Sequence, residues 1–372
     1  MTKITVYQHE IKPGALKAPY IQENFDEVRK FHRGLSAYAP SPMISLPALA
    51  KKLGLGGIYV KDESKRFGLN AFKGLGASYA VHHVLKQDPS IETIVAATDG
   101  NHGKAVAWAA HQSGRNAVIF MPKGTAPARS KAIEDIGDTK VTVTDSNYAD
   151  AVRMASQYAD EHKATLVQDT AFEGYREIPE KVVLGYSTMA AEAADELEKA
   201  GKRPTHIFLQ AGVGSMAAGN LAYFAHRYKD DLPTFIIMEA EETACLYESI
   251  KQGKFVAIGG HSDTKMAGLN CGEANPDILP LLDQFAEFYV KCADQVTFEG
   301  MRQLARPLPG DEAIVSGECG GVGTGLIMNL MTDEGLSAQR DAMGLNEKSV
   351  VLLFSTEGDT DPVHYQEVVE GR

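Results

Sequence analysis

Lys73 is the residue whose type and position say most about possible chemistry. It lies in the polar stretch Lys61–Ala77, which follows the strand-like run Gly57–Val60 and opens a helix. Backbone N–H groups at a helix start favour the neutral form of a nearby amine and attract an anion. An uncharged lysine beside an anion site can form an imine with a phosphorylated carbonyl compound. Most lysines are solvated surface cations, so this interpretation depends on the segments that accompany Lys73.

Two later turns each join an apolar strand to a helix. One reads Thr-Asp-Gly-Asn-His-Gly over Thr98–Gly103, and the other is rich in small residues over Gln210–Gly219. A turn of this kind can bind a phosphate with its backbone N–H groups. The alternative is a helix-capping turn that binds nothing. The residues best suited to bind a phosphate are Gly212, Val213, Gly214, Ser215 and Met216.

In this order, the lysine, the Gly-Asn-His-Gly turn and the glycine turn resemble the fold type II pyridoxal phosphate enzymes, which include tryptophan synthase β and threonine dehydratase. The resemblance covers nearly the whole chain. It implies an α/β fold with two open, mostly parallel sheets flanked by helices, and a cofactor cleft between a large and a small domain. It also implies pyridoxal 5'-phosphate joined covalently to Lys73, with Asn101 donating to the phenolate oxygen of the ring.

Acidic residues indicate which family within this fold the chain resembles most. Dehydratases of this group carry a small residue where this chain has Asp99, and their C-terminal turn of the Ser-Gly-Gly-Asn type corresponds here to Ser355–Asp361. Together with Gln168–Tyr175, these strings resemble the diaminopropionate ammonia-lyase family. That resemblance implies a homodimer that eliminates the β-amine of 2,3-diaminopropionate, in both D and L forms, to give pyruvate and two ammonia molecules.

Asp99 and Asp169 are the candidate acid and base residues beside Lys73. An aspartate that follows a strand is usually a turn or helix cap. Two of them facing one cleft would attract a leaving group that begins as an ammonium, and their mutual repulsion would raise at least one pKa toward that of a general base. The resemblance implies that Asp99 takes the proton from the D substrate and Lys73 from the L substrate. Asp169 would assist proton transfer or hold the distal ammonium.

A neutral hydroxyl is expected at the pyridine nitrogen of the cofactor. Ser355 stands in the place of the family's C-terminal serine, Thr356 is a credible substitute, and the sequence does not separate them. A hydroxyl leaves the ring a weaker electron sink than a carboxylate would, which suits β-elimination. His102 is interpreted as a packed or helix-capping histidine.

Composition limits the class of protein and its partners. The chain has 372 residues, of which 44% are hydrophobic and 23% charged, as in an ordinary globular protein. Its formal charge of −12 argues against nucleic-acid and anionic-membrane partners. The start lacks an apolar signal core, and no later stretch is long and apolar enough to span a bilayer, so a cytoplasmic location is expected.

The four cysteines are spaced too far apart for a paired zinc site or a dense disulfide framework. The spacing leaves open whether Cys245 and Cys271 pair. No metal is therefore expected, although a monovalent cation bound by carbonyl oxygens would leave no signal in the sequence.

Apolar runs alternate with helical patterns, which predicts right-handed βαβ units. The small domain is expected at 89–184 and the large domain at 1–88 and 185–372. Ligands bind at the C-terminal ends of parallel strands, where several candidate residues fall. The predicted small-domain strands are 94–97, 116–121, 140–144 and 165–168, the helices between them are 102–113, 126–136 and 147–161, and the large-domain strands include 205–210, 234–239 and 349–355.

The closest alternative function is a serine or threonine dehydratase of the same fold, which expels a hydroxyl. Asp99 speaks against it, because a neutral hydroxyl leaving group does not need a carboxylate. A non-catalytic amino-acid-binding module is a second alternative, disfavoured by the intact lysine and glycine turn. An NAD-dependent dehydrogenase is a third, but Ala217 stands where its Gly-x-Gly-x-x-Gly fingerprint needs the last glycine.

Overall fold

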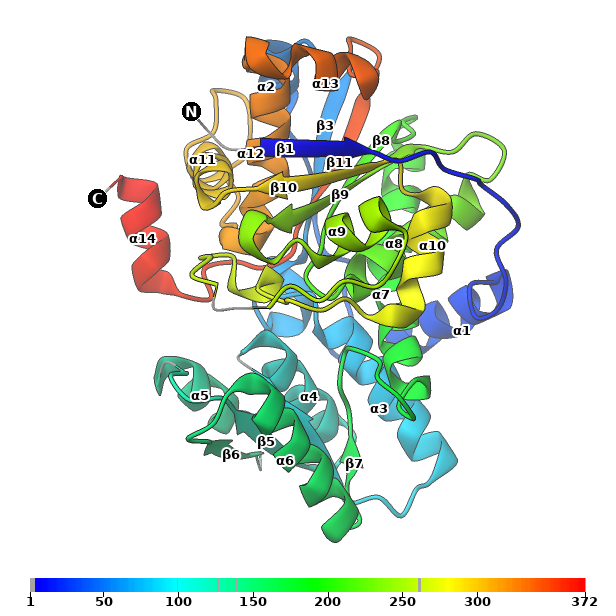
Figure 1. The fold of residues 1–372 in the computed structure, drawn as a ribbon, viewed down its shortest axis with the longest axis vertical. Coiled ribbons are helices and arrows are strands. Elements are labelled where there is room, and N and C mark those ends of the chain that lie inside the picture. The colour runs from blue at the N-terminus through cyan, green and yellow to red at the C-terminus, as the bar shows by residue number, and fades with distance from the viewer. Residues whose placement is uncertain (1–3, 99, 126, 138, 260–261, 372) are drawn as a thin grey trace. The chain divides into compact units, whose positions relative to one another are not determined.

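The computed structural model describes residues 4–98, 100–125, 127–137, 139–259 and 262–371, and Figure 1 labels its elements. The chain forms two compact units. The larger unit takes residues up to 25, 39–72 and from 187 on, and the smaller unit takes 26–38 and 73–186. Helices α1 (Gln22–Arg33) and α7 (Glu177–Lys199) run through both.

These divisions differ from the predicted domain boundaries at 89 and 184. Helix α3 (Gly74–Gln87) groups with the smaller unit because it packs against α4 (Asn101–Gln112). The packing is tertiary, so no composition change marks it in the sequence. Lys73 is consequently the first residue of the smaller unit after Phe72 of the larger one.

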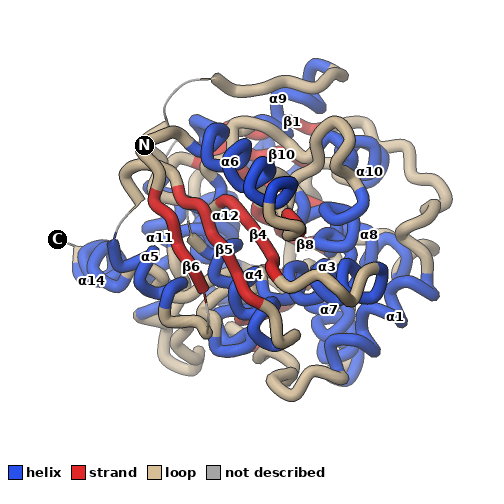
Figure 2. Tube along the Cα trace, turned by 90° about the horizontal axis from the view of Figure 1, so that it is seen from below, coloured by secondary structure: helices blue, strands red, loops and turns tan. Residues whose placement is uncertain are grey.

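The smaller unit contains a four-stranded sheet in the order β6-β5-β4-β7, and all its strand pairs are parallel. Figure 2 shows β4, β5 and β6 side by side. Apolar side chains such as Val95, Val118 and Ala155 form its core. The predicted βαβ succession is confirmed. Its elements are α3, β4 (Thr93–Ala97), α4, β5 (Asn116–Met121), α5 (Pro127–Glu134), β6 (Thr139–Val143), α6 (Tyr148–Glu161) and β7 (Thr165–Leu166).

Strand β7 ends two residues before the predicted end at 168. The backbone N–H of Val167 still donates to the carbonyl of Val95. The next donor on β4, the N–H of Ala97, bonds instead to the side-chain oxygen of Gln168 at 2.9 Å. A side chain thus replaces the backbone ladder, and the chain is free to turn at Asp169.

The larger unit contains a seven-stranded sheet in the order β1-β10-β9-β8-β11-β3-β2. The five inner strands run parallel, while β1 and β2 at the edges are antiparallel to their neighbours. The prediction of two open, mostly parallel sheets is confirmed. The strands are β1 (Ile4–Gln8), β2 (Met43–Ser45), β3 (Gly57–Asp62), β8 (His206–Gln210), β9 (Thr234–Ala240), β10 (Phe288–Cys292) and β11 (Val350–Ser355).

The inner strands of this sheet are covered on both faces, since consecutive residues Ile207, Phe208 and Leu209 are all fully buried. No helix in the described ranges is both long and apolar enough to cross a membrane. The helices are α2 (Pro47–Leu53), α8 (Ser215–Arg227), α9 (Cys245–Gln252), α10 (Leu279–Phe285), α11 (Asp294–Ala305), α12 (Glu318–Thr332), α13 (Ser337–Ala342) and α14 (Pro362–Glu370), with short 3-10 turns at Glu63–Gly68, Glu241–Thr243, Ala267–Leu269, Pro276–Ile278 and Glu334–Leu336.

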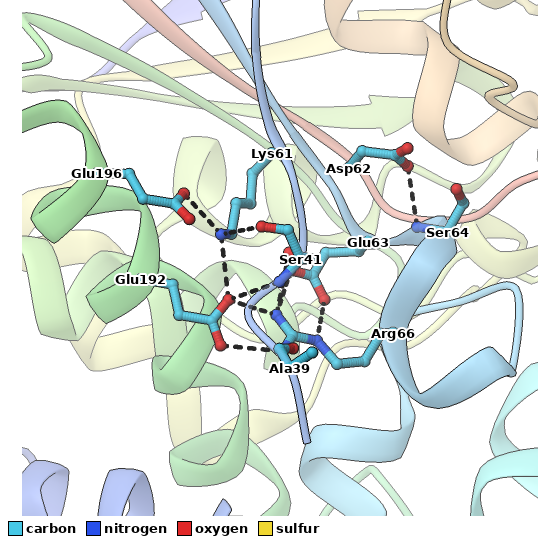
Figure 3. Close-up of polar contacts among 9 residues, drawn as sticks. All are labelled: Ala39, Ser41, Lys61, Asp62, Glu63, Ser64, Arg66, Glu192 and Glu196. Carbon is cyan, nitrogen blue, oxygen red and sulfur yellow. Dashed lines mark hydrogen bonds and ion pairs between the residues drawn. The ribbon is translucent and has the colours of Figure 1, made fainter. Parts of the chain in front are cut away.

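A buried network of charges lies where β3 leaves this sheet (Figure 3). Arg66 donates to both carboxylate oxygens of Glu192, at 2.9 and 2.7 Å, and to both oxygens of Glu63 at 2.8 Å. Lys61 donates to Glu196 at 2.8 Å and to the carbonyl of Ser41 at 2.6 Å. We call this the Arg66 cluster, consisting of Ser41, Lys61, Glu63, Arg66, Glu192 and Glu196.

Candidate active site

Lys73 and Asp169 form an ion pair within the smaller unit. Lys73 directly precedes α3, and its Nζ donates to Oδ2 of Asp169 at 2.5 Å. The side chains of Lys73 and Asp169 keep 19% and 10% of their surface exposed, so the pair is largely buried but still reached by solvent. An ammonium and a carboxylate at this distance can exchange a proton, which is a requirement for acid–base chemistry.

His102 faces the same carboxylate oxygen of Asp169 as Lys73 does. Its Nδ1 is 3.7 Å from Oδ2 of Asp169, and its Nε2 is 2.8 Å from the carbonyl oxygen of Val167. Burial opposes ionisation of Asp169, but the charges of Lys73 and His102 outweigh it and hold the pKa of the carboxyl well below its usual value. Asp169 is therefore an ionised carboxylate between two basic groups.

The loop that carries Asp169 is held in place by Tyr175. The Tyr175 hydroxyl donates to the carbonyl of Leu166 at 2.9 Å and accepts the N–H of Gln168 at the same distance. Burial raises the pKa of this phenol, so it stays a neutral donor. With the side-chain bond from Gln168 to β4, the backbone on the N-terminal side of Asp169 is fixed.

Glycines let the helices that carry Lys73 and His102 approach their neighbours closely. A Cβ at Gly185 of α7 would lie 2.7 Å from the Cα of Gly76, so α3 and α7 cross with their backbones almost in contact. A Cβ at Gly103 would overlap Thr98 and Ile119, so the start of α4 packs directly on β4 and β5. Gly76 and Gly103 are thus required by packing.

In the larger unit, the turn from β8 to α8 has the properties of an anion site. Gly214 caps α8 with φ of +92°, a conformation that favours glycine. A Cβ at Gly212 would lie 2.8 Å from the carbonyl of Gly268 and 2.9 Å from Sγ of Cys271. The helix-start amides and the buried hydroxyl of Ser215, which accepts from Asn275 at 3.2 Å, suit a phosphate group.

Ser355 is the last residue of β11, the strand beside β8, and Thr356 directly follows it. Ser355 is fully buried, and its hydroxyl bonds to that of Ser316 at 2.8 Å. The Thr356 hydroxyl accepts from Nε2 of Gln210, the last residue of β8, at 3.1 Å. Since Thr356 accepts this bond, its own hydrogen can be donated to another acceptor.

The segment leading to Lys73 is paired with this C-terminal turn. Phe72 donates its N–H to the carbonyl of Thr356 at 3.1 Å, and Gly358 donates to the carbonyl of Asn70 at 3.0 Å. Asn70 has φ of +60°, a left-handed conformation that few residue types adopt readily. These two bonds fix the backbone immediately before Lys73 to the turn that follows Ser355.

The predicted site residues that the structure describes lie in three places. Lys73 and Asp169 are in contact, Asn101 is the first residue of α4, and residues 212–216 with Ser355 and Thr356 lie at the ends of two neighbouring strands. Asp99 lies outside the residues that the structure describes. Gln168 and Tyr175, which fix the Asp169 loop, were not singled out individually, although both stand in the string that the sequence marked.

Neither a metal cluster nor a disulfide is found in the described part of the chain. No group of three or more His, Cys, Asp or Glu side chains there could hold a metal ion. The four cysteines are free thiols, and Cys245 lies with its Sγ 3.8 Å from the carbonyl of Gly212.

Comparisons with known proteins identify the family of this chain. Residues 35–355 match the family of pyridoxal-phosphate dependent enzymes. The diaminopropionate ammonia-lyase of Escherichia coli K12 is 42% identical over 388 residues, covering 100% of this chain and 97% of that protein. The crystal structure of the Escherichia coli enzyme with an aminoacrylate–PLP azomethine intermediate has a TM-score of 0.95 at 42% identity, covering 100% of this chain and 98% of that one.

A biosynthetic L-threonine dehydratase of Lactococcus lactis is a more distant relative. It is 30% identical over 173 residues, which is 46% of this chain and 39% of that protein. Since the family model spans most of the chain and the ammonia-lyase matches it from end to end, this protein belongs to the diaminopropionate ammonia-lyase family of pyridoxal-phosphate dependent enzymes.

Proposed function

We propose that this chain catalyses the α,β-elimination of 2,3-diaminopropionate to pyruvate and two ammonia molecules. The observation that carries the proposal is the Lys73–Asp169 ion pair, a lysine of the cofactor-linking type held by a carboxylate at 2.5 Å. The full-length match to an ammonia-lyase supports the same reaction. Pyridoxal 5'-phosphate, when bound, supplies the electron sink that makes the α-proton removable.

Each part of the chain takes one task in this proposal. Lys73 joins the cofactor and removes the α-proton of the L substrate. Residues 212–216 bind the phosphate through helix-start amides. Thr356 donates to the pyridine nitrogen, because its hydroxyl accepts from Gln210 and keeps a hydrogen to give, while that of Ser355 bonds to Ser316. Asn101, at the start of α4, donates to the ring oxygen.

Asp169 favours an amine over a hydroxyl as the leaving group. Its ionised carboxylate attracts the distal ammonium of diaminopropionate, whereas the hydroxyl of serine or threonine offers no charge to it. A dehydratase has no need for such a group. We therefore place the distal amine of the substrate at Asp169.

An assay of 2-oxo acid formation by purified, cofactor-loaded protein tests the proposed function, because diaminopropionate and serine give pyruvate and threonine gives 2-oxobutyrate. D- and L-diaminopropionate should both give pyruvate at high rates, and serine and threonine should be poor substrates. Ammonia should appear at twice the amount of pyruvate with diaminopropionate. Faster turnover of serine or threonine than of either diaminopropionate enantiomer would make the protein a dehydratase.

Asp99 is proposed as the base for the D substrate. Asp99→Asn keeps the size of the side chain but removes its ability to accept a proton. Turnover of the D enantiomer should fall by roughly 10²–10⁴-fold, and that of the L enantiomer much less. The measurement is the rate with each enantiomer at confirmed cofactor occupancy. Equal losses would make Asp99 a shared electrostatic group.

A cytoplasmic homodimer is proposed from the resemblance to the same family. Light scattering of the purified protein measures its mass in solution. A monomer or a larger assembly would contradict the dimer.

A further inference from the structure

The two ring nitrogens of His102 have different surroundings, and together they fix the state of the ring. Nε2 lies 2.8 Å from the carbonyl oxygen of Val167, which can only accept, so Nε2 carries a hydrogen. Nδ1 faces the carboxylate of Asp169 at 3.7 Å. The side chain is 4% exposed, so water screens this contact little.

This arrangement favours the charged ring. In a neutral imidazole with its hydrogen on Nε2, the lone pair of Nδ1 would face the negative charge of Asp169. A second proton on Nδ1 turns that repulsion into attraction between an imidazolium and a carboxylate. His102 is packed, as the sequence indicated, and its ring also faces a carboxylate.

The positive charge of His102 matters for Asp169 once Lys73 is joined to the cofactor. As a free ammonium, Lys73 balances the buried carboxylate of Asp169. A lysine whose Nζ is joined to the cofactor no longer offers that ammonium. Burial raises the pKa of the phenols of Tyr175 and Tyr186, which therefore stay neutral and add no further negative charge beside Asp169.

We propose that His102 is a positioning residue: as an imidazolium anchored to Val167, it keeps Asp169 ionised and oriented when Lys73 offers no ammonium, both while Lys73 is joined to the cofactor and while it acts as the neutral base. This role rests on the proposed tasks of Lys73 and Asp169 in the elimination. His102 acts on the reaction through Asp169 and has no contact of its own with the substrate.

Nitrogen-15 NMR of the holoenzyme tests the charge directly. Histidine labelled in the ring is introduced into the full chain, and the signals of His102 are assigned by their loss in His102→Gln. At neutral pH both ring nitrogens should have the chemical shifts of an imidazolium. In Asp169→Asn holoenzyme the ring should become neutral, with its hydrogen on Nε2. A neutral ring in the wild-type holoenzyme would overturn the proposal, whatever the activity of the variants.

A double-mutant cycle tests whether His102 acts through Asp169. Glutamine at 102 can still donate to Val167 but carries no charge, so His102→Gln should lower kcat with diaminopropionate about 10–100-fold, a coupling typical of contacting residues. In the Asp169→Asn background the same change should have little further effect. Independent, multiplying losses would contradict the proposal.

His102→Asn is the matched control for the hydrogen bond between His102 and the carbonyl of Val167. It loses the bond to Val167 as well as the charge, so its thermal stability should fall below that of His102→Gln while its kcat is equal or lower. If glutamine and asparagine variants keep wild-type kcat, the charge has no role in the reaction. A wild-type protein inactive on diaminopropionate would refute the proposed function instead, and the NMR measurement would still decide the state of His102.

Discussion

The Arg66 cluster and the Lys73–Asp169 pair are both made of opposite charges, yet their surroundings differ. In the cluster, Arg66, Lys61 and Glu192 are at most 2% exposed, and each charged group has several partners. In the pair, Lys73 is 19% exposed, and Asp169 has two basic neighbours of different chemistry. The cluster (Figure 3) is a closed network, whereas the pair can be opened by a ligand.

This difference separates buried charges that stabilise the fold from those that can take part in a reaction. Removing one member of a closed network leaves an uncompensated buried charge, so the loss appears in stability. A lysine that is partly exposed and bonded to a carboxylate can give up that bond and take part in a reaction. The two regions should therefore respond in opposite ways to equivalent substitutions.

The largest expected effect is on activity at Lys73. Lys73→Ala removes both the covalent attachment and a base, so turnover should fall by more than about 10⁴-fold, the upper range for loss of a general base. Borohydride reduction should no longer attach the cofactor to the chain. Lys86→Ala is the control, because Lys86 lies on α3, the helix that Lys73 precedes, is 64% exposed and forms a surface ion pair with Glu27 at 3.2 Å. Wild-type attachment in Lys73→Ala would assign the link to another lysine.

The next effect is on stability at Glu192. Glu192→Gln removes the buried carboxylate that Arg66 and Lys61 share, so that Arg66 keeps only the charge of Glu63 in the cluster and Lys61 only that of Glu196. The free energy of unfolding should drop by about 3–5 kcal/mol at neutral pH, as when one partner of a buried ion pair is removed. Urea titration followed by circular dichroism measures it. A loss as small as that of a surface pair would mean that the cluster is not a structural element.

Lowering the pH should reduce the difference in free energy of unfolding between the wild type and Glu192→Gln. Burial opposes ionisation of Glu192, but bonds to Arg66 and the charge of Lys61 lower its pKa below the ordinary value of 4.5. A lowered folded-state pKa gives stability that is fully present above the unfolded value and is lost as pH falls through the folded one. Unfolding curves from about pH 7 to about pH 3 should therefore converge only below about pH 4.5. Convergence already near neutral pH would contradict this sign.

The smallest effect is expected at an exposed pair that serves as the baseline. Arg227 and Glu198 form an ion pair with both side chains more than one-third exposed. Glu198→Gln should change the free energy of unfolding by about 0.2–1 kcal/mol, because water and salt screen the pair. The same urea titration provides the comparison. A change comparable to that of Glu192→Gln would show that burial does not separate the two kinds of pair.

Local patterns in the sequence were sufficient for much of the fold. Alternating apolar and helical runs predicted the strands at 94–97, 116–121 and 205–210 to within one residue, because parallel strands buried on both faces are continuous apolar runs. Edge strands β1 and β2 were not predicted, since a short strand at an edge has little hydrophobic pattern. The glycine turn was recognisable because only small residues fit its conformation.

The sequence by itself determined which residue types are present for chemistry: a lysine before a helix, a glycine turn after a strand and aspartates at strand ends. Only the tertiary structure decided which of them meet. Lys73 and Asp169 are 96 residues apart, and His102 and Val167 are 65 apart. The distances depend on how α3, α4 and the loop after β7 pack, and no local propensity encodes that packing. The charge state inferred for His102 follows from those contacts, so it could not be obtained from the sequence.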